Sequence, residues 1–218
     1  MTTIDYKQLA AQLSCPQGEH GVEVGHRMNL SNISMTQSSL YALDLNTNDR
    51  LLEVGHGNCG HLDFVYSTFG NIHYHGIEIS ETMYQEAINN NLHLSQKYPV
   101  KFYLYEGQKL PFQENYFDKI LTVNTIYFWK DVRSFLKEIH RVLKPNGVFT
   151  IAFAHKSFMT QLPFVRHGFK LYSPEEVTTL LTSSSFTIDD LLDFEEGIQS
   201  KVNTSVTRQF SVIRALKL

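Results

Sequence analysis

A glycine-rich stretch preceded by an acidic residue is the part of this chain whose residue types and spacing could most directly do chemistry. It contains Glu53, Gly55, Gly57 and Gly60, and an apolar run leads into it. Glycine lacks a Cβ, so it lets the backbone turn sharply or approach a ligand closely. The helical pattern that follows would offer free backbone N–H groups, which favour an anionic ligand group. The stretch therefore predicts a site for a nucleotide-type cofactor.

Two kinds of cofactor are compatible with the glycine spacing. The three glycines fit G-x-G-x-x-G, the dinucleotide fingerprint, and Glu78 lies near the distance expected of a ribose-binding acid. Glu53 favours another ligand, because a carboxylate would repel the phosphates of a dinucleotide but suits a molecule that carries an ammonium and a sulfonium. An NAD(P)-dependent oxidoreductase with a Rossmann site remains the alternative.

Three blocks within residues 50–155 resemble the class I S-adenosylmethionine-dependent methyltransferases, in particular the bacterial small-molecule group known as methyltransferase type 11. The run Glu-Val-Gly-His-Gly-Asn-Cys-Gly at 53–60 is similar to the family motif E/D-x-G-x-G-x-G. Residues 105–121 resemble a later stretch with Leu-Pro-Phe and Phe-Asp, and 135–147 resemble its closing helix and turn, with Asn146 replacing a glycine. The resemblance implies methyl transfer to a small organic acceptor by in-line displacement, with S-adenosylhomocysteine as product.

The resemblance also implies which residues would hold S-adenosylmethionine. Loop N–H groups would bind the methionyl carboxylate, Glu78 both ribose hydroxyls, and Glu106 the adenine amino group. Asn124 and Thr125, at the end of the fourth strand, would lie near the transferring methyl. The expected cofactor-binding residues are Glu53, Gly55, His56, Gly57, Gly60, Glu78, Ile79, Met83, Glu106, Gly107, Asn124 and Thr125.

The acceptor end is expected among aromatic residues and under residues 156–173, an insertion that could act as a lid. The expected substrate-binding residues are Met28, Tyr127, Trp129, Phe158, Phe164 and Tyr172. His155, just after the fifth strand, is the first candidate for a catalytic base, followed by His26 and Tyr127. An acceptor that is already nucleophilic needs no base. The lack of an evident base also leaves open a non-catalytic S-adenosylmethionine-binding module.

Composition narrows the class of function. The chain has 218 residues, 42% hydrophobic, with a formal net charge of -3, which gives no general attraction to nucleic acid. No apolar run is long enough to cross a membrane. Cys15 and Cys59 are too few for a disulfide framework, and the ten histidines form no recognisable metal motif. We expect a cytoplasmic enzyme without a metal, a monomer or homodimer, whose partner is a small-molecule acceptor.

Alternation of strand and helix patterns predicts an α/β fold, with a Rossmann-like, mostly parallel seven-stranded sheet and helices on both faces. Residues 1–45 are expected to form an N-terminal helical cap, with a helix over Ser34 to Leu43, and 46–218 the methyltransferase domain. The expected strands are 50–55, 72–79, 100–105, 117–123, 147–154, 187–194 and 208–216, and the expected helices between them are 60–69, 81–97 and 131–143. The last two strands have no helix between them, so they should pair antiparallel, which resembles the reversed last strand of the family.

Overall fold

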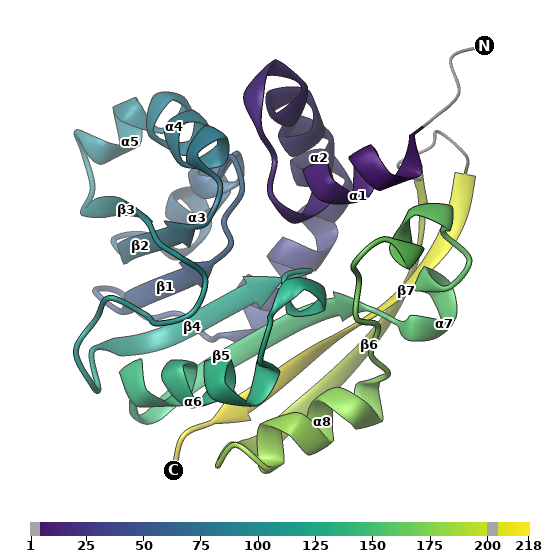
Figure 1. Cartoon of the computed structure of the whole chain (residues 1–218). Coiled ribbons are helices and arrows are strands. Elements are labelled where there is room, and N and C mark those ends of the chain that lie inside the picture. The colour runs from purple at the N-terminus through teal and green to yellow at the C-terminus, as the bar shows by residue number, and fades with distance from the viewer. Residues whose placement is uncertain (1–4, 200–204) are drawn as a thin grey trace.

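A seven-stranded sheet forms the centre of the computed structural model, which describes residues 5–199 and 205–218 (Figure 1). The strand order is β3-β2-β1-β4-β5-β7-β6. The strands are β1 Arg50–Val54, β2 His73–Glu78, β3 Val100–Leu104, β4 Phe117–Val123, β5 Leu143–Ala154, β6 Thr187–Gln199 and β7 Ser205–Leu216. β1 to β5 pair in parallel, whereas β7 lies between β5 and β6 and runs antiparallel to both. The predicted sheet with a reversed last strand is confirmed.

Helices cover both faces of the sheet because successive strand residues point to opposite sides. Leu51 packs into a core with residues of α3 (Leu62–Phe69) and α4 (Glu81–Asn90). Its neighbour Leu52 packs into the other core, with residues of α6 (Val132–Val142) and α8 (Pro174–Thr182). Each face of the sheet is thus covered by an apolar core, and loops lie at the carboxyl ends of the parallel strands. No helix within residues 5–199 or 205–218 is long and apolar enough to span a membrane.

The N-terminal segment folds into α1 (Tyr6–Ser14) and one long helix, α2 (Gly18–Ala42). The expected helix at 34–43 therefore overlaps only the last third of α2. The earlier part of α2 was missed because glycine replaces large apolar residues where the helix packs closely: a Cβ on Gly25 would collide with the thioether of Met83 in α4. α2 contacts α4, β4, β5 and β7, so it crosses above the sheet (Figure 1).

Two other segments differ from expectation in detail. The helix predicted over 81–97 is divided into α4 and α5 (Leu92–Ser95), and Asn91 between them donates from Nδ2 to the carbonyl oxygens of Ala87 and Cys59. The insertion at 156–173 contains α7 (Lys156–Met159) and a 3₁₀ turn, η2 (Pro163–Arg166). A second 3₁₀ turn, η1 (Ile126–Phe128), follows β4. These short elements surround the carboxyl ends of β4 and β5.

Candidate functional site

The loop after β1 turns through left-handed backbone at three alternate positions. Gly55 has φ 76°, Gly57 φ 58° and Cys59 φ 50°. A Cβ on Gly55 would collide with the methyl group of Thr125, whereas a Cβ on Gly57 would meet nothing within 4 Å. Glycine at 55 therefore lets the β1 and β4 ends approach, and glycine at 57 leaves bare backbone facing open space.

Cys59, rather than Gly60, is the third left-handed residue of the loop. The thiol of Cys59 lies 3.2 Å from the Tyr74 hydroxyl, and its carbonyl accepts a hydrogen bond from Asn91 Nδ2 at 3.1 Å. These contacts hold a non-glycine residue in a conformation it rarely adopts. The loop geometry thus follows the G-x-G-x-G spacing of the methyltransferases and not the G-x-G-x-x-G triplet.

A cavity lies between this loop, the carboxyl ends of β1, β2 and β4, and helix α2. It encloses about 1020 Å³ of space, part of it open to solvent, and we call it the loop cavity. Its wall contains ten of the twelve expected cofactor-binding residues: Glu53, Gly55, His56, Gly57, Glu78, Ile79, Met83, Gly107, Asn124 and Thr125. Unexpected wall residues include Asn29, Asn32, Asn58, His61 and Tyr105. Those on α2 were missed because the helix was predicted to begin too late.

Two expected cofactor residues, Gly60 and Glu106, are not on this wall. The backbone of Gly60 is covered by the side chain of Asn29, which a Cβ there would strike. Glu106 is exposed, while its neighbours Tyr105 and Gly107 line the cavity. Alternate side chains of an extended segment point to opposite sides, so Tyr105 inward places Glu106 outward. Gly60 and Glu106 therefore do not line the loop cavity, and their expected cofactor roles stay predictions.

Glu78, at the end of β2, is fixed by backbone donors. Its Oε2 accepts from the N–H of Gly57 at 3.0 Å, and its Oε1 accepts from the N–H of Ile79 at 2.7 Å and of Ser80 at 3.0 Å. An ionised carboxylate offers about four lone-pair sites, so it has capacity for a further donor from the cavity. The side chain is buried and aligned before any ligand arrives.

Glu53 is a buried carboxylate at the base of the same wall. Its Oε2 accepts from His61 Nε2 at 2.8 Å and from the Tyr74 hydroxyl at 2.5 Å. Burial by itself would raise the pKa of Glu53, but the charge and hydrogen bond of His61 and the hydrogen bond of Tyr74 lower it below its ordinary value. The loop cavity therefore has the Glu53 carboxylate and its hydrogen-bond partner His61 together at its base.

The cluster around Glu53 also brings together side-chain atoms of the kind that bind metals, but each of these atoms is already hydrogen-bonded. Glu53, Cys59 and His61 bring three ligand-type atoms within 4.8 Å of one another. The Tyr74 hydroxyl bonds to both Glu53 and Cys59, and burial raises the pKa of that thiol. The cluster is thus accounted for by hydrogen bonds among its own members.

The loop N–H groups are only partly available to a ligand. Four of them are donated within the protein: Gly55 to the Ile77 carbonyl, Gly57 to Glu78, Cys59 to the His56 carbonyl, and Gly60 to Asn58 Oδ1. Within the described part of the chain, the N–H groups of His56 and Asn58 have no such acceptor, and both residues line the cavity. Of the loop N–H groups expected to bind the methionyl carboxylate, those of His56 and Asn58 are therefore the candidates.

A second cavity adjoins the first, on the side of the insertion. It encloses about 600 Å³, part of it open to solvent, and we call it the apolar cavity. It is lined by Leu13, Met28, Asn32, Asn124, Tyr127, Phe128, Ala154, Phe158, Met159, Leu162, Phe164, Phe169, Ile198 and Arg208. Leu13, Met28, Asn32, Asn124 and Phe128 also line the loop cavity, so the two spaces meet along these residues.

Four of the six expected substrate-binding residues line the apolar cavity: Met28, Tyr127, Phe158 and Phe164. Trp129 lines the loop cavity instead, because η1 turns it toward the cofactor side. Tyr172 lines neither cavity, and its backbone carbonyl accepts from Lys156 at the start of α7. The aromatic pocket is therefore built mainly from η1, α7 and η2.

None of the three candidate bases is placed to act as one. His155 Nε2 lies 2.6 Å from Ser211 Oγ on β7, and His155 lines neither cavity. His26 is exposed on α2 and lines neither. The Tyr127 hydroxyl lines the apolar cavity, but it accepts from the Ala154 N–H at 2.6 Å, and burial raises its pKa far above neutrality. These contacts give none of the three an evident role as a base, and the catalytic residue stays a prediction.

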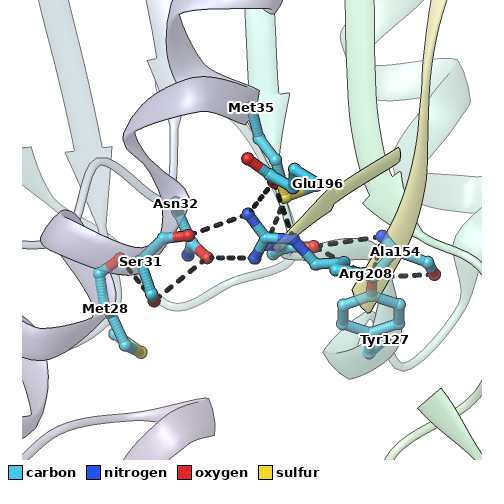
Figure 2. A network of polar contacts seen from close by, with 9 residues as sticks. Met28, Ser31, Asn32, Met35, Tyr127, Ala154, Glu196 and Arg208 are labelled. Carbon is cyan, nitrogen blue, oxygen red and sulfur yellow. Dashed lines mark hydrogen bonds and ion pairs between the residues drawn. The ribbon is translucent and has the colours of Figure 1, made fainter. Parts of the chain in front are cut away.

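Arg208 is the principal residue near the two cavities that no sequence motif pointed to (Figure 2). It is 4% exposed, and its guanidinium pairs with Glu196 on β6, with Nε to Oε1 at 3.0 Å. It also donates to Asn32 Oδ1 at 3.2 Å and to the Ser31 carbonyl at 2.8 Å, both on α2. Alternation along β7 puts it on the same side as Phe210 and Val212, which is the only signal of its burial.

Comparison with known proteins agrees with this geometry. Residues 52–151 match the family model described as a methyltransferase domain. An uncharacterized methyltransferase of Bacillus subtilis, YdaC, is 29% identical over 125 residues, which cover 56% of this chain. Those residues span 66% of YdaC, just under two thirds of its length.

One solved structure with the same fold is a chain from the complex between the Haloferax volcanii Trm112 methyltransferase activator and a methyltransferase. Its TM-score is 0.73 at 16% identity, covering 100% of this chain and 99% of that one. A phosphoethanolamine N-methyltransferase of Haemonchus contortus, in complex with phosphomonomethylethanolamine and S-adenosylhomocysteine, has a TM-score of 0.70 at 14% identity, covering 99% and 60%. The family model, the relatives and the sheet order support the resemblance to class I S-adenosylmethionine-dependent methyltransferases that the sequence motifs indicated.

Proposed function

We propose that this chain transfers a methyl group from S-adenosylmethionine to a small organic acceptor. The observation that carries the proposal is the pair of adjoining cavities at the carboxyl edge of the sheet, one with a polar floor and one apolar. Ligands of open α/β sheets bind at this edge. A transfer reaction needs two ligands whose reacting atoms meet, and Asn32, Asn124 and Met28 border both spaces.

The donor set of the loop cavity fits S-adenosylmethionine. The N–H groups of His56 and Asn58 would hold its carboxylate, and the charge of Glu53 would favour its cationic part. Glu78, fixed by three backbone N–H groups, would accept the ribose hydroxyls. Ile79, Met83, Tyr105 and Gly107 would enclose the adenine. When bound there, the cofactor supplies a methyl group activated on a sulfonium.

The chain's own residues would contribute positioning and the exclusion of water. Helix α2 covers both cavities, because Met28 and Asn32 line each of them. Holding two reactants in line can lower a barrier by about 7–11 kcal/mol in favourable cases. An oxidoreductase that uses NAD(P) is disfavoured, since residues 52–151 match a methyltransferase domain and β7 runs antiparallel to β5.

Thermal shift and turnover test the proposal. S-adenosylhomocysteine should raise the melting temperature and NADH should not, because only the former matches the charges of the loop cavity. Transfer of a labelled methyl group to any acceptor would exclude a non-catalytic cofactor-binding module. A melting temperature raised by NADH but not by S-adenosylhomocysteine would refute the proposal. A cytoplasmic location and the state of monomer or homodimer stay predictions.

A further inference from the structure

The described residues that line the apolar cavity include no group that could remove a proton from an acceptor. Among the described residues that line it, none is His, Asp, Glu, Lys or Cys. Tyr127 stays protonated at neutral pH because burial raises its pKa, and an arginine does not act as a base. Of the nearby histidines of the loop cavity, His61 bonds to Glu53, and His56 bonds through Nδ1 to the Gly57 carbonyl. His56 Nε2 has no hydrogen-bond partner, but its ring packs against Phe102 and the residue does not line the apolar cavity. An acceptor must therefore arrive already nucleophilic.

Among the described residues that line this cavity, Arg208 is the charged one. Arg208 lines the cavity, whereas Glu196, with which it forms an ion pair, does not, so the cationic member of the pair is the one at the wall. The bonds to Ser31 and Asn32 hold the guanidinium plane in place from the opposite side (Figure 2). A fixed guanidinium at an apolar wall favours an anionic oxygen and repels an ammonium.

The polar groups lie together where the two cavities meet. Arg208 donates to Asn32, and Asn32 and Asn124 border both spaces. The rest of the wall, toward α7 and η2, is apolar or aromatic, with Phe158 and Phe164 among its members. An acceptor that fills the cavity would therefore direct an apolar body toward the insertion and its anionic end toward the loop cavity.

We propose that the acceptor is an apolar carboxylic acid, which is methylated on a carboxylate oxygen to give a methyl ester. The inference rests on the proposed methyltransferase function and names the substrate class of the same site. A carboxylic acid has a pKa of about 4, so it is ionised at neutral pH without a base. Its oxygen attacks the methyl carbon as the carbon–sulfur bond breaks, and that bond's electron pair stays on sulfur. No proton moves, and the negative oxygen and the positive sulfonium both become neutral.

Other acceptors fit the cavity less well. An alkylamine is protonated at neutral pH, so it would meet Arg208 as a like charge and find no base. An alcohol keeps its proton for the same lack of a base. A phenol is also protonated at neutral pH and would become reactive only as the pH approaches about 10.

A chain-matched panel tests the substrate class directly. Decanoate, decanol and decylamine differ only in the head group, and 3-phenylpropionate and 4-propylphenol separate an aromatic acid from a phenol. With labelled S-adenosylmethionine, we expect methyl esters of decanoate, 3-phenylpropionate or both, at a rate that does not rise between pH 6.5 and 8.5. Methylation of the amine, alcohol or phenol without either acid would overturn the inference, as would no methylated product in a protein that still binds S-adenosylhomocysteine. Failure to bind S-adenosylhomocysteine would instead refute the proposed function.

Binding of the two acids to the S-adenosylhomocysteine complex gives a second readout that needs no turnover. Arg208→Gln should lower the affinity for the acid by about tenfold or more, which is the scale of a lost charged hydrogen bond. Arg214→Gln is the matched control, because Arg214 lies on the same strand and pairs with Asp189 but lines neither cavity. Glu196→Gln should bind the acid at least as tightly as the unaltered protein. Unchanged acid affinity in Arg208→Gln, with S-adenosylhomocysteine binding and melting temperature retained, would contradict the inference. If Arg208→Gln does not fold, weaker acid binding in Glu196→Gln decides against it.

Discussion

The carboxylate of Glu78 accepts the backbone N–H of Gly57 at 3.0 Å, which ties the end of β2 directly to the loop that follows β1. One side chain thus aligns the backbone of the loop and presents its remaining lone pairs to the cavity. The two roles are coupled, because a substitution of Glu78 removes its hydrogen bond to the Gly57 N–H and with it a constraint on the loop backbone. Loss of this carboxylate should therefore affect the cofactor more than it affects the fold.

Glu78→Ala should weaken S-adenosylhomocysteine binding by at least about 1–3 kcal/mol, the cost of losing a charged hydrogen bond. Isothermal titration calorimetry measures the loss. Glu81→Ala is the matched control, since Glu81 is an exposed acid of α4 that bonds to Gln85 and lines neither cavity. Equal affinities of the two variants would count against a ribose contact by Glu78.

Gly55→Ala should lower both stability and cofactor affinity. The new Cβ would be held at positive φ and pressed against the Thr125 methyl, and strain of this kind costs about 1–3 kcal/mol. Urea unfolding measures the stability change, and calorimetry with S-adenosylhomocysteine measures the affinity. Gly197→Ala on β6 is the control, because its Cβ would meet nothing within 4 Å. A similar small effect in both variants would contradict the close approach of loop and strand.

Sequence patterns predicted the sheet, its reversed last strand and many of the residues that line the loop cavity, because these features depend on local signals. Apolar runs mark strands, and the glycine spacing marks the turn between β1 and α3. The same signals failed for α2, whose buried face at Gly25 carries no apolar side chain to reveal it. Arg208 could not be selected either, since its role depends on Asn32, which lies far away in the sequence and on a helix that was placed too short.

His75 should make the protein less stable as the pH falls. Burial, followed by the nearby charges of Lys101 and His73, lowers its pKa from 6.5 to about 4. The folded state therefore keeps a neutral ring while the unfolded chain takes up a proton below about pH 6.5, so stability is lost between pH 6.5 and 4. At pH 5 the loss relative to pH 7 should be about 2 kcal/mol.

The variant His75→Gln isolates this contribution, since glutamine does not titrate. Urea unfolding at pH 7 and pH 5 should show a smaller acid-induced loss in His75→Gln than in the unaltered protein. His93 provides a comparison, because it is an exposed histidine on α5 and its replacement by glutamine leaves the buried ring untouched. Parallel pH curves for His75→Gln and the unaltered protein would refute the prediction.

Tyr127→Phe should cost stability but leave the pH dependence of methyl transfer unchanged. The Tyr127 hydroxyl accepts from the Ala154 N–H at 2.6 Å and donates to Asn124 Oδ1 at 2.9 Å. Its removal loses both bonds and leaves the Ala154 N–H only the longer bond to Asn124 Oδ1 at 3.3 Å, at a cost of about 1–3 kcal/mol. Burial raises the pKa of Tyr127, so its hydroxyl is protonated at neutral pH and cannot take a proton from the acceptor. The plot of rate against pH should therefore keep its shape in the variant. Urea unfolding and initial rates from pH 6 to 9 measure the two effects separately. Loss of a rising limb in the rate profile of Tyr127→Phe would restore Tyr127 as a base and would mean that the acceptor arrives protonated.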